Sequence, residues 1–519
     1  MDTKALRQKI LDLAIRGKLV PQDPNDEPAE VLLERIREQK QQMFKEGKLK
    51  KKDIKNDTII FKGEDNLHYE KFADGTVKCM EDEIPFEVPE GWAWCKLNDI
   101  YNFIDYRGAT PTKITNGIPL VTAKNVKSGY IDYTIDDYIS EEEFKERQQR
   151  GISKKGDILF TTEAPLGNAA LADMEKFSAG QRLITFQQYG SKNELINYVM
   201  LMFILSDFFQ QQLYVNKTGS TVAGIKAAIL KTLWIPVPPY NEQLRISNTL
   251  KSAINLIDSI SKNKEILSTS ISNTKSKILD LAIRGKLVPQ DPNDEPASVL
   301  LERIRAEKEE LIKQGKIRRD KKESVIFKGD DNSYYEKIGN KVNCIDEEIP
   351  FELSEGWAFI RLKTAWELIS GRDLSPSEYN DKNDGIPYIT GASNFRNGHI
   401  SLVRWTTVPQ VITRRGDLLL TCKGTIGEIA HNNFGEAHIA RQIMAIRNIY
   451  SLNVDFLALC IEYSMTKIKQ AANGLIPGIS REDILNLVIP IPPTKEQENI
   501  CNKLKATFSA IEHIEKSLN

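Results

Sequence analysis

The segment Val237-Pro238-Pro239-Tyr240 comes closest to a catalytic motif in this chain. An N6-adenine methyltransferase needs Asp, Asn or Ser before two prolines and an aromatic residue. The polar side chain then accepts a hydrogen bond from the amino group of a flipped base while the ring stacks on that base. Valine cannot accept this bond, and the related segment Ile491-Pro492-Pro493-Thr494 also lacks the ring. Both segments are therefore interpreted as proline-ended strands that lead into helices. A self-contained DNA adenine methyltransferase stays open as an alternative.

Other catalytic and metal-binding patterns are missing from the sequence. No Gly-x-x-x-x-Gly-Lys-Ser/Thr loop is present to bind the phosphates of ATP. His431 and His438 follow Cys422, but their spacing fits no standard zinc site. The six cysteines form no Cys-x-x-Cys pair and are interpreted as reduced structural thiols. We expect no catalytic residues, no metal and no cofactor on this chain.

Length and composition limit the possible classes of protein. A chain of 519 residues is expected to form two to four domains. No apolar run is long enough to span a membrane, and Met1 to Lys18 does not resemble a signal peptide. We therefore expect a cytoplasmic protein without a membrane partner. The formal net charge is −1, so any positive surface that binds nucleic acid must be local.

An internal repeat is the strongest signal in the sequence. Residues 9–37 and 277–305 are identical at 28 of 29 positions, the exception being Glu30 against Ser298. The match continues more weakly to Gly91-Trp92-Ala93 and Gly356-Trp357-Ala358. A repeat of this kind predicts two structural units.

The middle of each copy diverges strongly. Only short islands remain, such as GDILFTTEAPLG at 156–167 against GDLLLTCKGTIG at 416–427. The copies converge again at IPVPPYNEQ (235–243) and IPIPPTKEQ (489–497). Duplication for structural economy alone predicts uniform divergence. The observed pattern instead favours a shared scaffold that carries two different recognition regions.

Apolar residues after each Pro-Pro recur at alternating spacings of four and three, which indicates a coiled-coil seam. We predict a helix from about 242 to 284, with Thr494 and Gln497 forming a capping box at the start of the C-terminal helix. The N-terminus continues the seam that the C-terminus begins. The predicted spacer-helix packing residues are Ile246, Leu250, Ile257, Ile260, Leu267, Ile271, Ile278, Leu281, Ile500, Leu504, Ile511, Ile514, Leu6, Ile10 and Leu13.

The register of these repeats predicts how the helices pair. The C-terminal and N-terminal pieces together match the central helix with only residues 266–268 left over. Two antiparallel helices related by a pseudo-two-fold axis are the economical arrangement, with residues 519 and 1 close together. Gly17 and Gly285 are predicted to end the long helices, before charged helices at 31–46 and 299–314.

These segments resemble the specificity subunits of type I restriction–modification systems. The resemblance rests on RGKLVPQDPNDEPAxVLLERIR, on the Pro-x-Gly-Trp start at Pro89 to Trp92, and on the IPxPPxxEQ helix entry. It covers almost the whole chain, in the order target-recognition domain, central helix, second target-recognition domain, distal helix. The second copy departs from the pattern with Ser354 in place of the proline.

The resemblance implies a non-catalytic subunit that reads a bipartite target in double-stranded DNA, one half per recognition domain. Its helices would set the spacing of the half-sites and dock two modification (methyltransferase) subunits. Restriction (translocase/nuclease) subunits would join them. S-adenosylmethionine, ATP and Mg are then expected on the partner subunits. A coiled-coil scaffold without DNA readout is a further alternative.

Base readout needs Arg, Lys, Asn, Gln, Ser, Thr or His on loops that can enter a major groove. The first copy offers Lys124, Asn125, Lys127, Ser128, Thr161, Thr162, Asn168, Gln181 and Arg182. The second copy offers Ser393, Asn394, Arg396, Asn397, His399, Lys423, Thr425, Arg441 and Gln442. Some of these residues would instead belong to solvated turns, and Arg182 and Arg441 would then be structural ion-pair partners.

The expected fold is α+β, with two target-recognition domains, each a twisted β-sheet plus helices, joined by a long antiparallel helix pair. The predicted segments are 1–58 (N-terminal half of the spacer helix plus charged helix), 59–237 (first recognition domain), 238–324 (central spacer helix plus charged helix), 325–490 (second recognition domain) and 491–519 (C-terminal half of the spacer helix).

Overall fold

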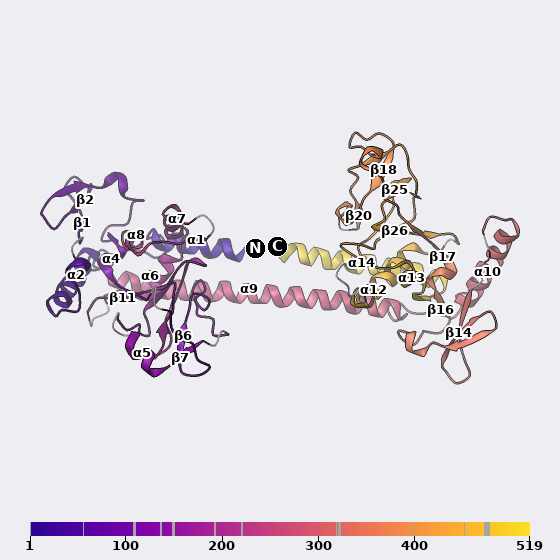
Figure 1. The fold of residues 1–519 in the computed structure, drawn as a ribbon, viewed down its shortest axis with the longest axis horizontal. Helices are drawn as coiled ribbons and strands as arrows, with labels where there is room; N and C mark the ends of the chain where they lie inside the picture. The colour runs from indigo at the N-terminus through magenta and orange to yellow at the C-terminus, as the bar shows by residue number, and fades with distance from the viewer. Residues whose placement is uncertain are drawn as a thin grey trace. The chain divides into compact units, whose positions relative to one another are not determined.

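The computed structural model divides the chain into two compact units, Met1–Lys264 and Glu265–Asn519. Its described residues are 2–54, 57–106, 110–134, 137–147, 151–190, 194–219, 222–317, 319, 323–396, 398–450, 452–471 and 478–518. Both units mix helices with sheets, as predicted, and their four-stranded central sheets have the same strand order. In Figure 1, unit 1 is coloured from indigo through magenta to pink and unit 2 from pink through orange to yellow, and the residues of the central helix are divided between the two units.

Long helices run along one side of each unit. They are α1 (Thr3–Ile15), α9 (Tyr240–Ile283, 44 residues) and α14 (Thr494–Leu518). Gly17 and Gly285 follow α1 and α9 with φ of +65° and +68°, and the next residue donates back to the carbonyl of Leu13 or Leu281 at 2.8 Å. These are the predicted glycine caps. The predicted span of α9 is correct to within two residues.

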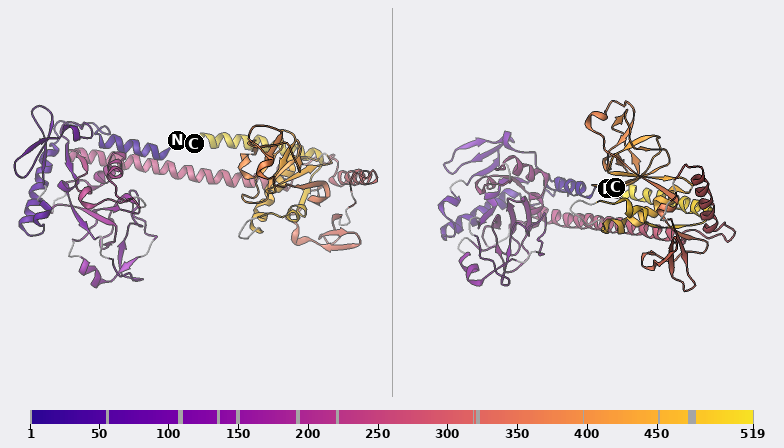
Figure 2. Two further views of the ribbon diagram at one scale, coloured as in Figure 1. Left: turned by 45° about the horizontal axis from the view of Figure 1, so that its top comes forward. Right: turned by 45° about the vertical axis from the view of Figure 1, so that its right-hand side comes forward.

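The helices pair in antiparallel fashion inside each unit. In unit 1, Arg7 of α1 forms an ion pair with Asp258 of α9, while Gln22 reaches Glu242 at the other end. In unit 2, Lys275 of α9 lies 2.8 Å from Glu515 of α14. Both views in Figure 2 show α1 beside the first half of α9.

A buried hydrogen bond joins the start of each long helix to the Gly-Trp segment. The indole Nε1 of Trp92 donates to Glu242 at 2.9 Å, and that of Trp357 donates to Glu496 at 3.0 Å. Both carboxylates are almost fully buried in the first turn of their helix. Burial raises the pKa of Glu242, whereas the Trp92 hydrogen bond opposes this shift.

Gln497 does not form the predicted capping box with Thr494, and Gln243 at the equivalent position of unit 1 bonds in the same way as Gln497. Gln243 donates its Nε2 to the carbonyl of Pro238 at 3.0 Å, and Gln497 donates to that of Pro492 at 2.9 Å. Thr494 is already the first residue of α14. The amide therefore turns back to the preceding strand, because a proline-ended strand leaves an unpaired carbonyl beside the helix start.

A helix and a small antiparallel sheet follow Gly17 in the first copy and Gly285 in the second. The elements in unit 1 are α2 (Ala29–Lys45), α3 (Lys51–Ile54), β1 (Ile59–Lys62), β2 (His68–Lys71) and β3 (Val77–Cys79). Those in unit 2 are α10 (Ala297–Lys313), β13 (Ser324–Lys328), β14 (Tyr334–Ile338) and β15 (Lys341–Cys344). Ion pairs to a buried carboxylate join each small sheet to the strand after the tryptophan. They are Lys96 with Glu70, and Arg361 with Glu336 at 2.8 Å.

The centre of unit 1 is an antiparallel sheet with the order β5-β11-β8-β9. A smaller sheet, β10-β6-β7, covers one face, and β12 pairs with β4 just before α9. The remaining bounds are β4 (Ala93–Lys96), α4 (Leu97–Ile100), β5 (Tyr101–Asp105), β6 (Ile118–Val121), β7 (Tyr138–Ile139), α5 (Glu141–Arg147), β8 (Ile158–Thr162), β9 (Leu166–Leu171), β10 (Ser178–Ala179), β11 (Leu183–Gln188), α6 (Asn197–Ile204), α7 (Asp207–Val215), α8 (Ala227–Leu230) and β12 (Trp234–Val237).

Unit 2 repeats this topology with the order β17-β26-β23-β24. The covering sheet is β21-β18-β25-β22, and β16 pairs with β27 before α14. The bounds are β16 (Ala358–Arg361), α11 (Leu362–Ala365), β17 (Trp366–Ser370), β18 (Ile386–Ile389), β19 (Phe395–Arg396), β20 (His399–Ile400), β21 (Trp405–Thr406), β22 (Ile412–Thr413), β23 (Leu418–Thr421), β24 (Ile429–His431), β25 (Ala437–Ile439), β26 (Ile443–Asn448), α12 (Val454–Ala471), α13 (Arg481–Leu485) and β27 (Val488–Ile491).

Each central sheet is buried on both faces. In unit 1, Ile158 and Phe160 pack with α6 and α7, while the alternate residue Leu159 packs with the covering sheet. The strands therefore read as continuous apolar runs. This explains why the GDILF and GDLLL islands persist in otherwise divergent segments.

The apolar seam of the long helices is only partly buried. Ile246, Leu250, Ile257, Ile271, Ile500, Leu504 and Ile511 are buried, and Leu6, Ile10, Leu13, Ile260, Ile278 and Leu281 are half-buried. Leu267 and Ile514 are 39% and 49% exposed, so the predicted packing is wrong for them within their unit. In α1, Leu11, Ala14 and Ile15 are buried instead, because α1 also packs against α6 and α7.

The remaining predictions have mixed outcomes. The predicted proximity of the chain ends concerns Met1 and Asn519, which lie outside the described residues. All six cysteines are free, and four of them are buried. Within the described residues, no helix is both long enough and apolar enough to cross a membrane.

The aspartate directly before β8 in unit 1, Asp157, and the one directly before β23 in unit 2, Asp417, have different partners. Asp417 is 2% exposed and accepts two hydrogen bonds from Arg447, at 3.0 and 2.8 Å. Asp157 is 7% exposed, and the aligned residue there is Gln187, whose amide donates at 2.8 Å. Burial raises the pKa of Asp157 to about 6, although the hydrogen bonds from Lys154 and Gln187 oppose this shift.

We predict that Glu242→Ala lowers the free energy of unfolding by about 2 kcal/mol, because it leaves the buried indole N–H of Trp92 without an acceptor. Glu496→Ala should have the same effect through Trp357. Glu242→Gln keeps an acceptor and is the matched control. Urea unfolding of the full chain measures the change, and equal stability of the Ala and Gln variants would contradict the prediction.

Asp157 should make stability depend on pH. Because its folded pKa is raised above the unfolded value, its contribution is fully present below about pH 4 and is lost as pH rises through 6. The loss amounts to at most about 3 kcal/mol. Asp157→Asn should therefore gain stability over the wild type between pH 4 and 7.5. Thermal unfolding across this range measures the difference, and a constant difference at all pH values would refute the prediction.

Candidate nucleic-acid interface

The candidate residues of unit 1 gather at one end of the central sheet. Strand β8 ends there and β9 and β11 begin there, since Thr161 pairs with Leu183. We call this surface, formed by residues 163–165, 181–182 and Thr110, the sheet end of unit 1. The corresponding sheet end of unit 2 comprises residues 372–373, 423–427 and 441–442. Loops at the end of a rigid sheet can be varied while the strands stay fixed.

The two residues directly before β11 in unit 1 are Gln181 and Arg182. Arg182 has a φ of +66°, and its carbonyl accepts hydrogen bonds from the N–H and hydroxyl of Thr162 at 2.9 and 3.1 Å. Its Nε lies 3.0 Å from Oε1 of Glu163. Gln181 donates to the hydroxyl of Thr110. The Arg182 backbone is therefore held by Thr162, while the Arg182 side chain remains 55% exposed.

The loop after β6 lies against the same end of the sheet. Asn125 accepts hydrogen bonds from the N–H and hydroxyl of Thr122 and donates to the carbonyl of Asp132, so it closes the loop. Asn168 donates to the carbonyl of Val126 at 3.0 Å and holds the loop to β9. Lys124 and Ser128 are exposed on this loop. Lys127 is half-buried and lies 3.9 Å from Asp132.

Unit 2 builds the corresponding loop in the same way. Asn394 accepts from the N–H and hydroxyl of Thr390 and donates to the carbonyl of Ser401 at 2.8 Å. The exposed side chains are Ser393, Arg396 and His399, the last two opposite each other in the β19–β20 pair. Asn397 lies outside the described residues.

The sheet end of unit 2 carries a different set of side chains. Nε of Arg441 lies 2.7 Å from Oδ2 of Asp373, and its backbone N–H donates to Oδ1 at 3.1 Å. Lys423, Thr425 and Gln442 are exposed beside it. Arg182 and Arg441 thus both form ion pairs, and each arginine side chain stays more than half exposed.

Four predicted contact residues have roles in the fold instead. Thr161, Thr162, Asn125 and Asn394 are at most 3% exposed, and backbone groups satisfy their side chains. A side chain this buried presents no surface to a base edge, so these four residues are excluded as candidate base contacts. A polar residue inside a strand or at a loop closure cannot be distinguished from an exposed one by type alone.

Sequence reasoning missed Glu163 and Asp373, because only basic, amide and hydroxyl side chains were considered. Glu163 has a signal, since it aligns with Lys423 inside an otherwise shared island. Asp373 has none, because it lies in the divergent middle of unit 2.

The segments considered for catalysis and metal binding are structural. Val237 ends β12, where it pairs with Ala93, and Tyr240 is the first residue of α9. His438 is fully buried, with Nδ1 accepting from the N–H of Val411 at 3.1 Å and Nε2 lying 2.8 Å from the carbonyl of Arg372. Among the described residues, no group of three or more His, Cys, Asp or Glu is placed to hold a metal ion.

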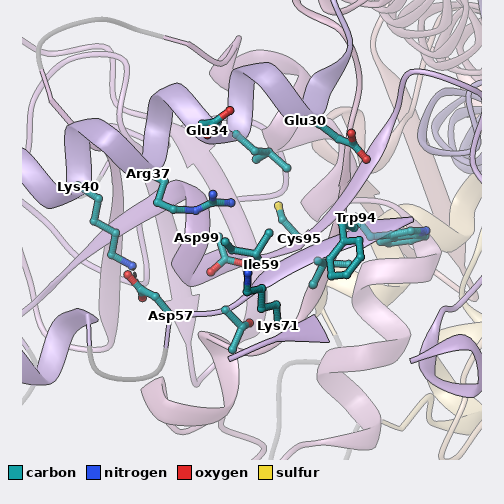
Figure 3. Close-up of a pocket in the computed structure, with 14 residues that line it drawn as sticks. Glu30, Glu34, Arg37, Lys40, Asp57, Ile59, Lys71, Trp94, Cys95 and Asp99 are labelled. Atoms are coloured by element: carbon teal, nitrogen blue, oxygen red, sulfur yellow. Dashed lines mark hydrogen bonds and ion pairs between the residues drawn. The ribbon is translucent and has the colours of Figure 1, made fainter. Parts of the chain in front are cut away.

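A cavity of about 410 Å³ lies between α2, β1 and β4 of unit 1, and Figure 3 shows the residues that line it. Among the lining residues, Lys40 forms an ion pair with Asp57 at 2.7 Å, and the thiol of Cys95 points to the carbonyl of Ile235. Burial raises the pKa of Cys95, so the thiol stays protonated and unreactive. Asp99 accepts from the N–H of Lys96 at 2.8 Å and caps α4. Lys40, Asp57, Cys95 and Asp99 therefore have partners within the fold.

Comparison with known proteins matches the two units separately. The family model described as "Type I restriction modification DNA specificity domain" matches residues 89–268 and 354–519. Each match includes the central sheet of one unit, followed by the first part of α9 in unit 1 and by α14 in unit 2. The helix-and-hairpin segments 17–88 and 285–353 lie outside these matches.

Curated relatives extend the similarity to the whole chain. The type I restriction enzyme EcoAI specificity subunit of Escherichia coli is 27% identical over 97% of this chain and 90% of its own length. The EcoEI specificity subunit of the same species is 26% identical over 99% of this chain and 90% of its length.

A chain from a solved structure described as "Structural basis underlying complex assembly and conformational transition of the type I R-M system" shares the fold. Its TM-score is 0.56 at 19% identity, covering 84% of this chain and 94% of that one. The family match alone spans well over half of the sequence, once in each unit. The chain belongs to the family of type I restriction–modification DNA specificity subunits.

Proposed function

We propose that this protein is the DNA-sequence specificity subunit of a type I restriction–modification complex, and that it has no catalytic activity of its own. The observation that carries the proposal is the pairing of one frame with two different surfaces. The central sheets have the same strand order, but the exposed side chains at their ends differ.

Each unit reads one half of a bipartite target in double-stranded DNA. The retained candidates in unit 1 are Lys124, Lys127, Ser128, Asn168, Gln181 and Arg182. Those in unit 2 are Ser393, Arg396, His399, Lys423, Thr425, Arg441 and Gln442, with Asn397 untested. Arginine matches the O6 and N7 acceptors of guanine and glutamine matches adenine, so the two sets suit different half-sites.

The long helices form an antiparallel coiled coil with a pseudo-two-fold axis, set the spacing of the half-sites and dock two modification subunits. Support comes from the sequence register and from the antiparallel ion pairs inside each unit. Exposed apolar side chains on the helices, Leu256, Leu267 and Ile514, suit a partner surface. Restriction subunits join this complex, and S-adenosylmethionine, ATP and Mg bind to the partners. The complex acts in the cytoplasm.

Replacing residues 98–235 with the recognition region of a relative should change one half-site and leave the other unchanged. Mapping methylated adenines in cells that express this chain with its modification subunits measures both halves at once. An unchanged target would favour a scaffold without readout. S-adenosylmethionine binding by the isolated chain in calorimetry would instead favour a self-contained methyltransferase.

Lys124→Ala should weaken DNA binding equally for cognate and non-cognate duplexes, because a lysine on an exposed loop contacts phosphate. The slope of log K against log salt should fall in magnitude by about 0.9 for one lost contact. Lys155→Ala is the matched control, since Lys155 is exposed just before β8 at the opposite end of the same sheet. Fluorescence anisotropy at several salt concentrations measures both variants, and equal slopes would refute the phosphate contact.

A further inference from the structure

Each sheet end holds an arginine against a carboxylate. In unit 1 the pair is Arg182 with Glu163, and in unit 2 it is Arg441 with Asp373. The arginine side chains are 55% and 67% exposed, and the carboxylates are 45% and 44% exposed. Both pairs therefore lie on the surface that would face DNA.

The shared frame does not require these pairs. Leu183 and Ile443 are the aligned first residues of β11 and β26, so Arg182 aligns with Gln442 and Arg441 with Gln181. The order of arginine and glutamine is thus reversed between the units. Glu163 comes from the β8–β9 turn, where unit 2 has Lys423, whereas Asp373 follows β17. The two units therefore form the same arginine–carboxylate contact from residues at different positions of the frame.

Stability does not account for the contact. An ion pair that is about half exposed contributes little to folding, because solvent screens it. A carboxylate on a DNA-facing surface also opposes binding, since it repels the phosphates. Both units nevertheless place a carboxylate beside their arginine.

The backbone beneath each arginine is fixed, so only the side chain remains to be oriented. The N–H and hydroxyl of Thr162 hold the carbonyl of Arg182 in unit 1. In unit 2 the N–H of Cys422 donates to the carbonyl of Gln442 at 2.8 Å, and the Cys422 thiol approaches the carbonyl of Arg441. Thr162 and Cys422 are both buried at the ends of aligned strands.

The carboxylates contact the guanidinium at Nε, the nitrogen next to the aliphatic stem. A carboxylate at this edge limits rotation of the planar group about its last bonds. The two Nη groups at the tip are the donors that match O6 and N7 of guanine in a bidentate contact.

We propose that Glu163 and Asp373 are positioning residues, which orient Arg182 and Arg441 toward guanine edges and restrain them from phosphates. They thereby set base discrimination rather than affinity. This inference rests on the proposed DNA-reading function and deepens it.

The test uses the full complex with its modification subunits and compares Glu163→Gln with the wild type. Affinity for non-cognate DNA should rise about three- to tenfold, and the salt slope should steepen by about 0.9, because Arg182 gains access to phosphate. Preference for one guanine in the unit 1 half-site should fall about tenfold, while the unit 2 half-site stays unchanged. Asp373→Asn should give the reciprocal pattern, so each variant controls for the other.

A conservative variant separates orientation from structure. Glu163→Asp should restore part of the guanine preference, which a loss of folding would not allow. The inference is overturned if Glu163→Gln leaves non-cognate affinity and base preference unchanged, since the pair is then an ordinary surface ion pair. It is also overturned if the variant weakens recognition equally at every position of the half-site. A wild-type complex without sequence preference in either half would instead reject the proposed function.

Discussion

The hydrogen bond between a buried tryptophan and the first-turn glutamate of a long helix is the contact on which each unit depends. Trp92 and Glu242 in unit 1, like Trp357 and Glu496 in unit 2, join the beginning of the recognition domain to the helix that follows its end. A charge-assisted bond in a buried site is worth more than a neutral one, and its loss leaves an unsatisfied donor. The carboxylate also lies at the positive end of the helix dipole.

This contact explains which parts of the two copies stay alike. The residue that ends the preceding long helix must be glycine where it packs against the tryptophan, because a Cβ on Gly285 would lie 2.8 Å from the Trp357 ring. The glutamine after the glutamate binds the proline carbonyl, and the strand before it pairs beside the tryptophan. The Gly-Trp and IPxPPxxEQ segments thus form one contact, although the tryptophan and the glutamate lie 150 residues apart in unit 1 and 139 apart in unit 2.

Periodicity and the repeat were sufficient to predict the helices, their glycine ends and the two-unit organisation, because these features depend on local spacing. Side-chain direction was not predictable in the same way. Gln497 turns back to Pro492 instead of capping its own helix, and Thr161 points into the sheet rather than toward a ligand. Asp373 meets Arg441 across 68 residues, which only the folded sheet brings together. Residue type thus marked the candidate loops but could not separate their exposed positions from the buried ones.

The structure also indicates why new recognition surfaces are compatible with one frame. Residues that fix the backbone of the sheet end, such as Thr162 and Cys422, are buried and form bonds through main-chain atoms. The side chains above them are exposed, and exposed substitutions usually change stability by no more than about 0.5 kcal/mol. The Asp157–Gln187 and Asp417–Arg447 pairs show the contrasting case, because a change at a buried position alters the electrostatics of the frame itself. Divergence is therefore least costly at the sheet ends, where Glu163 of unit 1 aligns with Lys423 of unit 2.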